Sequence, residues 1–133
     1  MQPNPLPILV VDDYESMRSI MSAMLKALGY EDVDSAEDAV AALQMMHDKS
    51  YGLVISDVNM EPMSGLQLLR SVRSNVAWQG TRFLLTTASL NASLVTAAKN
   101  GGADAYLLKP FTPSQLKLKL HEILSRFHVF GNR

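Results

Sequence analysis

Hydrophobic and polar residues alternate along the chain in two patterns. Short runs of consecutive apolar residues, typical of strands buried on both faces, are each followed by a longer stretch with the three- and four-residue spacing of a helix. The runs cover residues 8–11, 53–55, 83–85 and 105–108, with a weaker one near Val33. This alternation predicts βαβ units, and therefore an α/β fold with a parallel sheet covered by helices on both sides.

Five stretches with helical spacing follow these runs. The first is the clearest, because Gly29 ends its regular apolar stripe. The second begins at Ser35-Ala36-Glu37-Asp38, which resembles a capping box with Asp in place of Glu, and runs to about His47. The remaining three follow Ser64-Gly65, extend from Asn91 to Gly101-Gly102, and begin at Thr112-Pro113.

The last of these stretches fits two patterns. Residues 116–120 alternate like a strand, yet the cap and proline at Thr112-Pro113 favour a helix. As a helix it buries a stripe and leaves Leu118 off the buried face. The stripe consists of Leu116, Leu120, Ile123, Leu124 and Phe127. The whole order is (βα)5, a doubly wound five-stranded sheet.

Length and composition narrow the class of protein. At 133 residues with 47% hydrophobic content, the chain is expected to form one domain. We place this domain at residues 7–127, with an N-terminal extension at 1–6, a C-terminal tail at 128–133 and no output domain. A formal net charge of −1 disfavours binding to nucleic acid or to an anionic membrane.

Two features missing from the sequence, cysteine and a signal-like or membrane-spanning segment, bear on the cellular compartment of the protein. The chain contains no cysteine, which excludes disulfides and thiolate metal sites and fits a reducing environment. Its N-terminus lacks a basic signal-like region, and no apolar run approaches the roughly 20 residues needed to span a bilayer. We therefore expect a cytoplasmic protein without membrane partners.

Polar residues follow the strands at consistent positions. Asp12-Asp13 follow the first run, Asp57 the third, Thr86-Thr87 the fourth, and Lys109-Pro110 the fifth. In open α/β sheets ligands bind outside the carboxyl ends of the strands. Three carboxylates, a hydroxyl and an ammonium group are thus predicted to converge on one edge.

Such a cluster indicates metal-assisted phosphoryl chemistry. Crowded carboxylates must either hold protons or be neutralised by a cation. Mg²⁺ suits oxygen ligands and is commonly bound by one or two carboxylates together with phosphate oxygens. Lys109 and Thr87 can contact a phosphoryl group, which leaves one carboxylate as a possible nucleophile for an aspartyl phosphate.

Several short motifs together resemble the receiver domain of response regulators in two-component signalling, especially its chemotaxis regulators. They are Val10-Val11-Asp12-Asp13, Ser56-Asp57, Thr87-Ala88-Ser89 and Tyr106-Leu107-Leu108-Lys109-Pro110-Phe111. The resemblance implies the flavodoxin-like strand order 2-1-3-4-5. It also implies a switch, rather than an enzyme acting on other substrates, that takes a phosphoryl group on Asp57 from a histidine kinase or phosphotransfer protein.

The same resemblance implies roles for the residues around Asp57. Asp13, Asp57 and the backbone carbonyl of Asn59 would bind Mg²⁺ directly, and Asp12 through a water molecule. The phosphoryl-binding and switch residues would be Thr87, Ala88, Tyr106 and Lys109, with Tyr106 moving inward on activation. From sequence alone, Tyr106 fits a half-buried packing residue equally well. The Lys109–Pro110 peptide bond would be cis.

A downstream target would recognise the activated conformation. The expected surface lies on the fourth helix, the fifth strand and the fifth helix. Its candidate residues are Lys99, Tyr106, Leu118, Lys119 and Glu122.

The sequence departs from the family pattern after Asp57. Many receivers read Met-Pro-x-Met-Asp-Gly, whereas this chain reads Met60-Glu61-Pro62-Met63-Ser64-Gly65. Pro62 favours an extended backbone at Glu61, which puts the position of the Asn59 carbonyl, and with it the metal affinity, in question. Ser64 can still cap the third helix.

Three alternative functions remain open. A pseudo-receiver would bind a partner without phosphorylation. This alternative stays open because the displaced Pro62 puts the metal affinity in question. An aspartyl-phosphate phosphatase would have a second acid two residues after its nucleophile, where this chain has Asn59. A flavodoxin-like cofactor module would need a phosphate-binding loop after the first strand, where Asp12-Asp13 would repel the phosphate.

Overall fold

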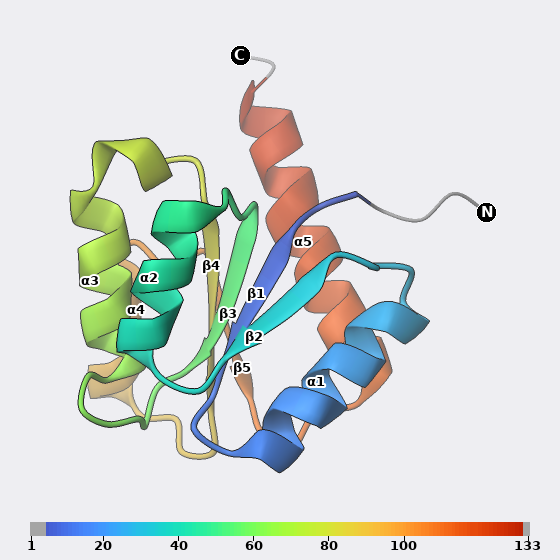
Figure 1. Ribbon diagram of the computed structural model, residues 1–133, viewed down its shortest axis with the longest axis horizontal. Helices are drawn as coiled ribbons and strands as arrows, with labels where there is room; N and C mark the ends of the chain where they lie inside the picture. Colours follow the sequence, from blue (N-terminus) through green and yellow to red (C-terminus); the bar gives the residue numbers. More distant parts are fainter. Residues whose placement is uncertain (1–4, 132–133) are drawn as a thin grey trace.

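A computed structural model describes the backbone of residues 5–131 and the side chains of residues 5–125. Five parallel strands form one sheet in the order β2-β1-β3-β4-β5, which confirms the predicted fold class and strand order (Figure 1). The strands are β1 (Ile8–Val11), β2 (Val33–Ala36), β3 (Leu53–Asp57), β4 (Arg82–Thr87) and β5 (Ala105–Leu108).

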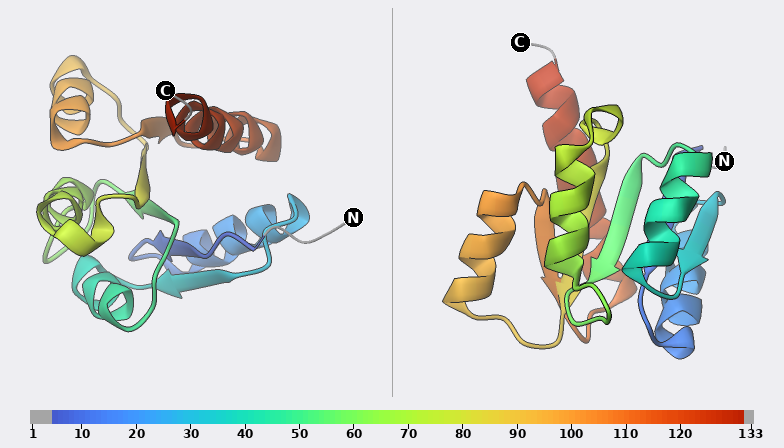
Figure 2. Two further views of the ribbon diagram at one scale, coloured as in Figure 1. Left: turned by 90° about the horizontal axis from the view of Figure 1, so that it is seen from above. Right: turned by 60° about the vertical axis from the view of Figure 1, so that its left-hand side comes forward.

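Helices cover both faces of the sheet, as the two further views show (Figure 2). The helices are α1 (Glu15–Ala27), α2 (Ala39–Asp48), α3 (Gly65–Ser74), α4 (Ala92–Gly101) and α5 (Pro113–Gly131), with a short 3-10 turn η1 (Val76–Trp78) after α3. Helices α1 and α5 pack on one face, and α2, α3 and α4 pack on the other. Helix α5 continues to Gly131, four residues past the expected domain boundary at 127.

Alternate residues of the central strands build two separate cores. Leu9 and Val54 pack under α2, α3 and α4, whereas Ile8, Leu53 and Ile55 pack under α1 and α5. All five side chains are buried. Because each strand needs apolar residues on both faces, it appears in the sequence as an unbroken apolar run.

Side-chain caps fix the starts of several helices. Ser64 and Gln67 form a reciprocal capping box at α3, and Thr112 and Gln115 exchange the same pair of bonds at α5. The Asn91 side chain accepts from the backbone N–H of Leu94 at 2.8 Å at the start of α4. These starts agree with the stretches expected from sequence.

The start of α2 was predicted wrongly. Ser35 lies in β2, paired with Val10, and the cap of α2 is Asp38, whose Oδ1 accepts from the backbone N–H of Ala41 at 2.8 Å. The edge strand uses Ser35 and Ala36 for pairing with β1, so the helix begins later than the polar cluster suggested. In α5, by contrast, Leu118 is 70% exposed as expected.

Among the residues that the structure describes, no helix is both long and apolar enough to cross a membrane.

Candidate functional site

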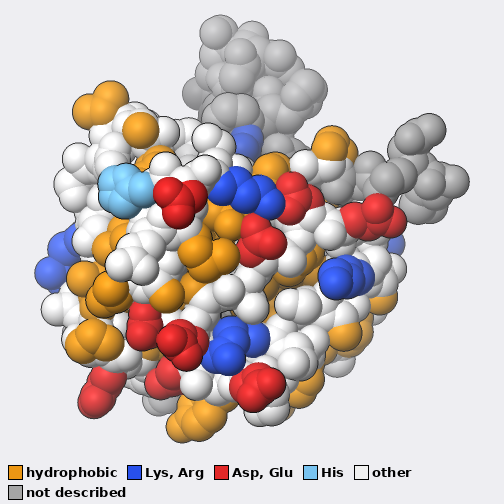
Figure 3. Space-filling model, in the orientation of Figure 1, with side chains coloured by type: hydrophobic (Ala, Val, Ile, Leu, Met, Phe, Trp, Pro, Cys, Tyr) orange, Lys and Arg blue, Asp and Glu red, His pale blue; other side chains and the backbone are white. Residues whose placement is uncertain are grey.

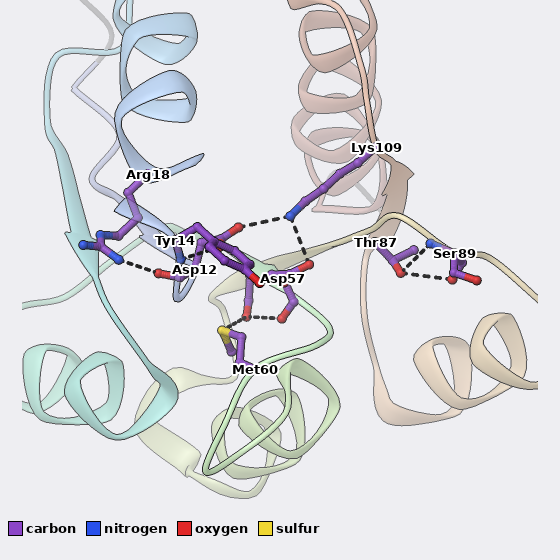
Figure 4. A network of polar contacts seen from close by, with 9 residues as sticks. Asp12, Tyr14, Arg18, Asp57, Met60, Thr87, Ser89 and Lys109 are labelled. Atoms are coloured by element: carbon purple, nitrogen blue, oxygen red, sulfur yellow. Dashed lines mark hydrogen bonds and ion pairs between the residues drawn. The ribbon is translucent and has the colours of Figure 1, made fainter. Parts of the chain in front are cut away.

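The acidic pocket, defined here by Asp12, Asp13 and Asp57, forms at the carboxyl ends of the central strands. Figure 4 shows Asp12 and Asp57 of this pocket with Lys109. Asp12 follows β1 directly, and Asp57 is the last residue of neighbouring β3. Because these strands are parallel with Val11 paired to Ser56, their next residues emerge at the same edge. Carboxylate oxygens of all three residues lie within 4.8 Å of one another.

Lys109 bridges the two buried carboxylates of the pocket. Its Nζ lies 3.1 Å from Asp12 Oδ2 and 3.1 Å from Asp57 Oδ1. The three side chains are 16%, 6% and 8% exposed, respectively. Lys109 reaches this position from the segment after β5, on the far side of β4 from Asp57, so residues distant in the chain meet here.

The pocket shifts the proton affinity of its buried groups. Burial raises the pKa of Asp57, and the nearby Lys109 only partly offsets this, while Asp12 and Asp13 raise it further. Burial disfavours the charged form of Lys109, but the hydrogen bonds and charges of Asp12 and Asp57 outweigh it and raise the lysine pKa. The raised pKa of Lys109 favours its ammonium form, and the raised pKa of Asp57 means that its carboxylate holds a proton more readily than an ordinary aspartate.

The first turn after β1 is held by contacts to the side chain and the backbone of Asp12. Its Oδ1 accepts from the Tyr14 backbone N–H at 3.0 Å, and Arg18 Nη1 donates to its carbonyl at 2.8 Å. Asp13, by contrast, is exposed at the mouth of the pocket. Neither Tyr14 nor Arg18 was singled out from sequence, since nothing in the local pattern marks these contacts to Asp12.

The donor set fits a hard divalent cation. Three carboxylates against one ammonium leave two uncompensated negative charges at the pocket. Oxygen ligands at mutual separations of a few ångströms match the requirements of Mg²⁺. The chemistry of the residues thus agrees with the cation that the sequence indicated.

The β3–α3 loop approaches the pocket from the other side. Asn59 and Glu61 on this loop line a groove together with Asp13. The loop is anchored where the Gly65 N–H donates to the Val58 carbonyl at 2.8 Å, and a side chain at position 65 would collide with the Asp57 carbonyl. Gly65 is therefore required for this approach, a constraint that sequence reasoning did not identify.

Two peptide bonds near the pocket are cis. One is Lys109–Pro110, the geometry that the family resemblance implies, and the other is Glu61–Pro62, which was not expected.

The Thr87 hydroxyl does not face Asp57 in this conformation. Thr87 ends β4 and is buried, and its Oγ1 donates to the Ser89 carbonyl at 3.0 Å and accepts from the Ser89 N–H at 3.2 Å (Figure 4). Ala88 is exposed beside it, and Tyr106 is 36% exposed on β5. The structure thus brings together the three aspartates and Lys109, but leaves the hydroxyl and Tyr106 outside that cluster.

The expected partner residues lie on α4, β5 and α5. Lys99, Tyr106, Leu118 and Glu122 are exposed, and Lys119 is half-buried. Lys119 Nζ pairs with Glu122 Oε2 at 3.6 Å.

Comparison with known proteins relates both chain and fold to one family. A model of the response regulator receiver domain matches residues 8–121. The chain is 35% identical over 121 residues to the chemotaxis protein CheY of Pseudomonas aeruginosa, covering 91% of this chain and 98% of that protein. It is 34% identical to CheY-3 of Vibrio cholerae, covering 91% of this chain and 93% of that protein.

Solved structures give the same result for the fold. The chemotaxis response regulator CheY4 of Vibrio cholerae has a TM-score of 0.85 at 32% identity, covering 90% of this chain and 99% of that chain. The receiver domain of the sensor histidine kinase PA1611 from Pseudomonas aeruginosa, solved with a magnesium ion in its active site cleft, has a TM-score of 0.82 at 23% identity, covering 92% of this chain and 99% of that chain.

Proposed function

The chain belongs to the response regulator receiver domain family, and from this membership we propose that it is a signalling switch phosphorylated on Asp57. The donor is a phosphohistidine on a histidine kinase or phosphotransfer protein. The observation that carries this proposal is the convergence of Asp12, Asp13, Asp57 and Lys109 at the carboxyl ends of the strands.

The proposed metal site uses the same carboxylates. Asp13, Asp57 and the backbone carbonyl of Asn59 would hold Mg²⁺, with Asp12 acting through a water molecule. When bound, the cation neutralises the negative charge of the carboxylates and of the phosphoryl oxygens. The two uncompensated negative charges of the pocket support this assignment.

The transfer step uses Asp57 and Lys109. A carboxylate oxygen of Asp57 forms a bond to phosphorus as the phosphorus–nitrogen bond of phosphohistidine breaks, and the imidazole leaves with that electron pair. Lys109, already 3.1 Å from Asp57 Oδ1, then pairs with a phosphoryl oxygen as a point charge. The protein catalyses only its own phosphorylation and dephosphorylation.

The signal is a shift between two conformations. In the conformation described here, the Thr87 hydroxyl is bonded to Ser89. A phosphoryl dianion on Asp57 favours the alternative, in which Thr87 turns to the phosphoryl group beside Ala88 and Tyr106 moves inward. A target protein then reads the face formed by α4, β5 and α5.

The relatives suggest the pathway. CheY of Pseudomonas aeruginosa and CheY-3 of Vibrio cholerae, matched over nearly their whole lengths, are chemotaxis proteins. We propose a chemotaxis-type role in the cytoplasm. The receiver acts there as a stand-alone domain, and it signals by binding a target protein rather than nucleic acid.

Intact-mass spectrometry after incubation with acetyl phosphate tests the switch chemistry. With Mg²⁺ we expect a single phosphoryl adduct on the wild type, and no adduct on Asp57→Asn or after chelation of the metal. A folded wild-type protein that gains no adduct at saturating Mg²⁺ would favour a pseudo-receiver instead.

A further inference from the structure

A groove of about 490 Å³ opens beside the acidic pocket along the β3–α3 loop. Its polar lining consists of Asp13, Asn59, Glu61 and Ser64. Asp13 also belongs to the acidic pocket, so the groove leads directly to the carboxylates around Asp57. A small phosphodonor entering along this groove passes the Glu61 side chain.

Glu61 occupies the position at which the common receiver pattern has proline, so this chain has a carboxylate where many receivers are uncharged. The side chain is exposed, and within the described residues it makes no hydrogen bond or ion pair. Glu61 itself is part of the lining of the groove. Its charge is thus directed to the groove without a protein partner to neutralise it.

In the space-filling view, acidic side chains lie along the lower edge of the molecule, where the strands have their carboxyl ends, with a basic side chain among them, and other acidic side chains lie in the upper half of the same face (Figure 3). Lys109 compensates charge inside the pocket through Asp12 and Asp57, but its ion pairs do not include Glu61. Charges lining a cleft act on an incoming ion over about 10 Å at 0.1 M salt. A dianion meets about twice the repulsion of a monoanion from the same carboxylate.

We propose that Glu61 is a specificity-determining residue that selects phosphodonors by charge at the groove beside Asp57. It disfavours small dianionic donors and tolerates donors with a positive charge next to the phosphorus. The preference is achieved by repulsion of the wrong donor rather than by contact with the right one. This inference rests on the proposed phosphorylation of Asp57.

Two small donors separate the charge effect from the chemistry. With acetyl phosphate, the carboxylate of Asp57 forms a bond to phosphorus while the phosphorus–oxygen bond breaks and acetate leaves. With the monoanion of phosphoramidate, whose nitrogen is protonated, the phosphorus–nitrogen bond breaks and ammonia leaves. Both reactions give the same aspartyl phosphate, but the first donor is a dianion and the second has a net single negative charge.

The test compares initial phosphorylation rates by intact mass at saturating Mg²⁺ and low ionic strength. For Glu61→Gln, we expect the rate with acetyl phosphate to rise by about threefold or more, with the phosphoramidate rate changed much less. Adding salt should raise the ratio of the acetyl phosphate rate to the phosphoramidate rate in the wild type. This ratio should then come close to the ratio measured for Glu61→Gln. Glu31→Gln, an equal charge change on an exposed residue before β2 at the opposite end of the sheet, serves as the matched control.

The outcomes distinguish this proposal from the function on which it rests. If both donors label Asp57 but Glu61→Gln changes their rates equally, or changes neither, Glu61 does not select the donor and the switch chemistry stands. If neither donor labels the wild type, the proposed function itself fails. An equal gain from Glu31→Gln would show a general effect of net charge and overturn the assignment to Glu61. If Glu61→Gln does not fold, the proposal is tested by Glu61→Ser and by the wild-type protein alone. A ratio of the two donor rates that does not change with salt in the wild type, or with Glu61→Ser, would overturn it.

Discussion

In the proposed metal site, Lys109 and the metal ion would neutralise the same carboxylates. Its ammonium group lies 3.1 Å from a carboxylate oxygen of Asp12 and from one of Asp57, and both residues belong to the proposed metal site. Two cationic species that neutralise one set of carboxylates weaken each other's binding. We therefore expect the lysine to lower metal affinity while it favours phosphoryl transfer.

Lys109→Met separates these two effects, because methionine keeps an unbranched chain but removes the charge. We expect tighter Mg²⁺ binding in calorimetric titration, together with a transfer rate from phosphoramidate reduced by roughly 100-fold. Lys119→Met on α5 is the control for charge alone. Unchanged or weaker Mg²⁺ binding in Lys109→Met would show that the lysine does not compete at this site.

Thr87 has a structural bond that it must give up in order to signal. Its buried hydroxyl both donates to and accepts from the Ser89 backbone, which holds the start of the β4–α4 loop. In the proposed active state the same hydroxyl turns to the phosphoryl group. The residue thus has two alternative partners, as expected of a switch.

Thr87→Val removes the hydroxyl while nearly preserving shape. We expect the free energy of unfolding in urea to fall by about 1 kcal/mol, since the Ser89 groups lose a partner. Phosphorylation of Asp57 should persist in the mass spectrum, but the conformational response to it should be lost. Thr87→Ser keeps the hydroxyl and should retain the response, and a fully responsive Thr87→Val protein would contradict the role assigned to Thr87.

The edge strand β2 is stabilised by a polar cluster at the amino ends of the strands. Lys49 Nζ pairs with Asp32 Oδ1 at 2.7 Å and Asp34 Oδ2 at 2.9 Å, and the Tyr51 hydroxyl donates to Asp34 Oδ2 at 2.7 Å. Burial, aided by the bond to Asp34, raises the pKa of Tyr51 to about 12. The cluster ties β2 to the segment between α2 and β3.

Stability should therefore fall in a defined alkaline range. The folded pKa of Tyr51 of about 12 lies above the ordinary value near 10, so folding favours the neutral phenol. Its contribution is complete below pH 10 and is lost as pH rises from about 10 to about 12. Urea midpoints should drop more steeply over this range in the wild type than in Tyr51→Phe, with exposed Tyr14→Phe behaving as wild type. Parallel curves for wild type and Tyr51→Phe would disprove the linkage.

The sequence was most informative for elements that are buried on both sides. Strands β1, β3 and β4 could be recognised because each contains an unbroken apolar run, at residues 8–11, 53–55 and 83–85. Their parallel order followed from the helices between them. Strand β2 was weaker because it lies at an edge and only Ala36 is fully buried. That is why Ser35 was assigned as the helix cap, and Asp38, the actual cap, was placed in the first turn of the helix.

The candidate site followed from strand ends, but its contacts did not. The position of a residue after a strand predicts which edge it reaches, and this sufficed to gather Asp12, Asp13, Asp57 and Lys109. It cannot predict that Lys109 pairs with Asp12 as well as Asp57, or that Thr87 faces Ser89. Those choices depend on side-chain rotamers and on loop paths that no local pattern encodes.

Signal transmission through the molecule should be one-sided. Thr87 ends β4 and Lys109 follows β5, and these adjacent strands border α4 and α5. Helix α2 lies at the other side of the sheet beside β2 and provides no residue to the acidic pocket. A change at Asp57 therefore has a direct route to the proposed partner face and none comparable to α2.

Hydrogen exchange measured by mass spectrometry tests this asymmetry. On phosphorylation we expect exchange rates to change by at least about twofold in residues 88–111, which span α4 and β5, with little change in residues 39–48. The difference should disappear in Thr87→Val. Equal changes on both sides would indicate a global loosening instead of a directed switch.

The central claim, that Asp57 is the phosphoacceptor, is tested most directly by chemical trapping of the modified residue. Borohydride reduces an acyl phosphate to an alcohol, so phosphorylated aspartate becomes homoserine and can be located by peptide mass spectrometry. After incubation with acetyl phosphate and Mg²⁺, homoserine should be found at position 57, and not at Asp12 or Asp13. Homoserine at another aspartate, or a phosphoryl group found stably on serine, threonine or histidine with position 57 unmodified, would contradict the account.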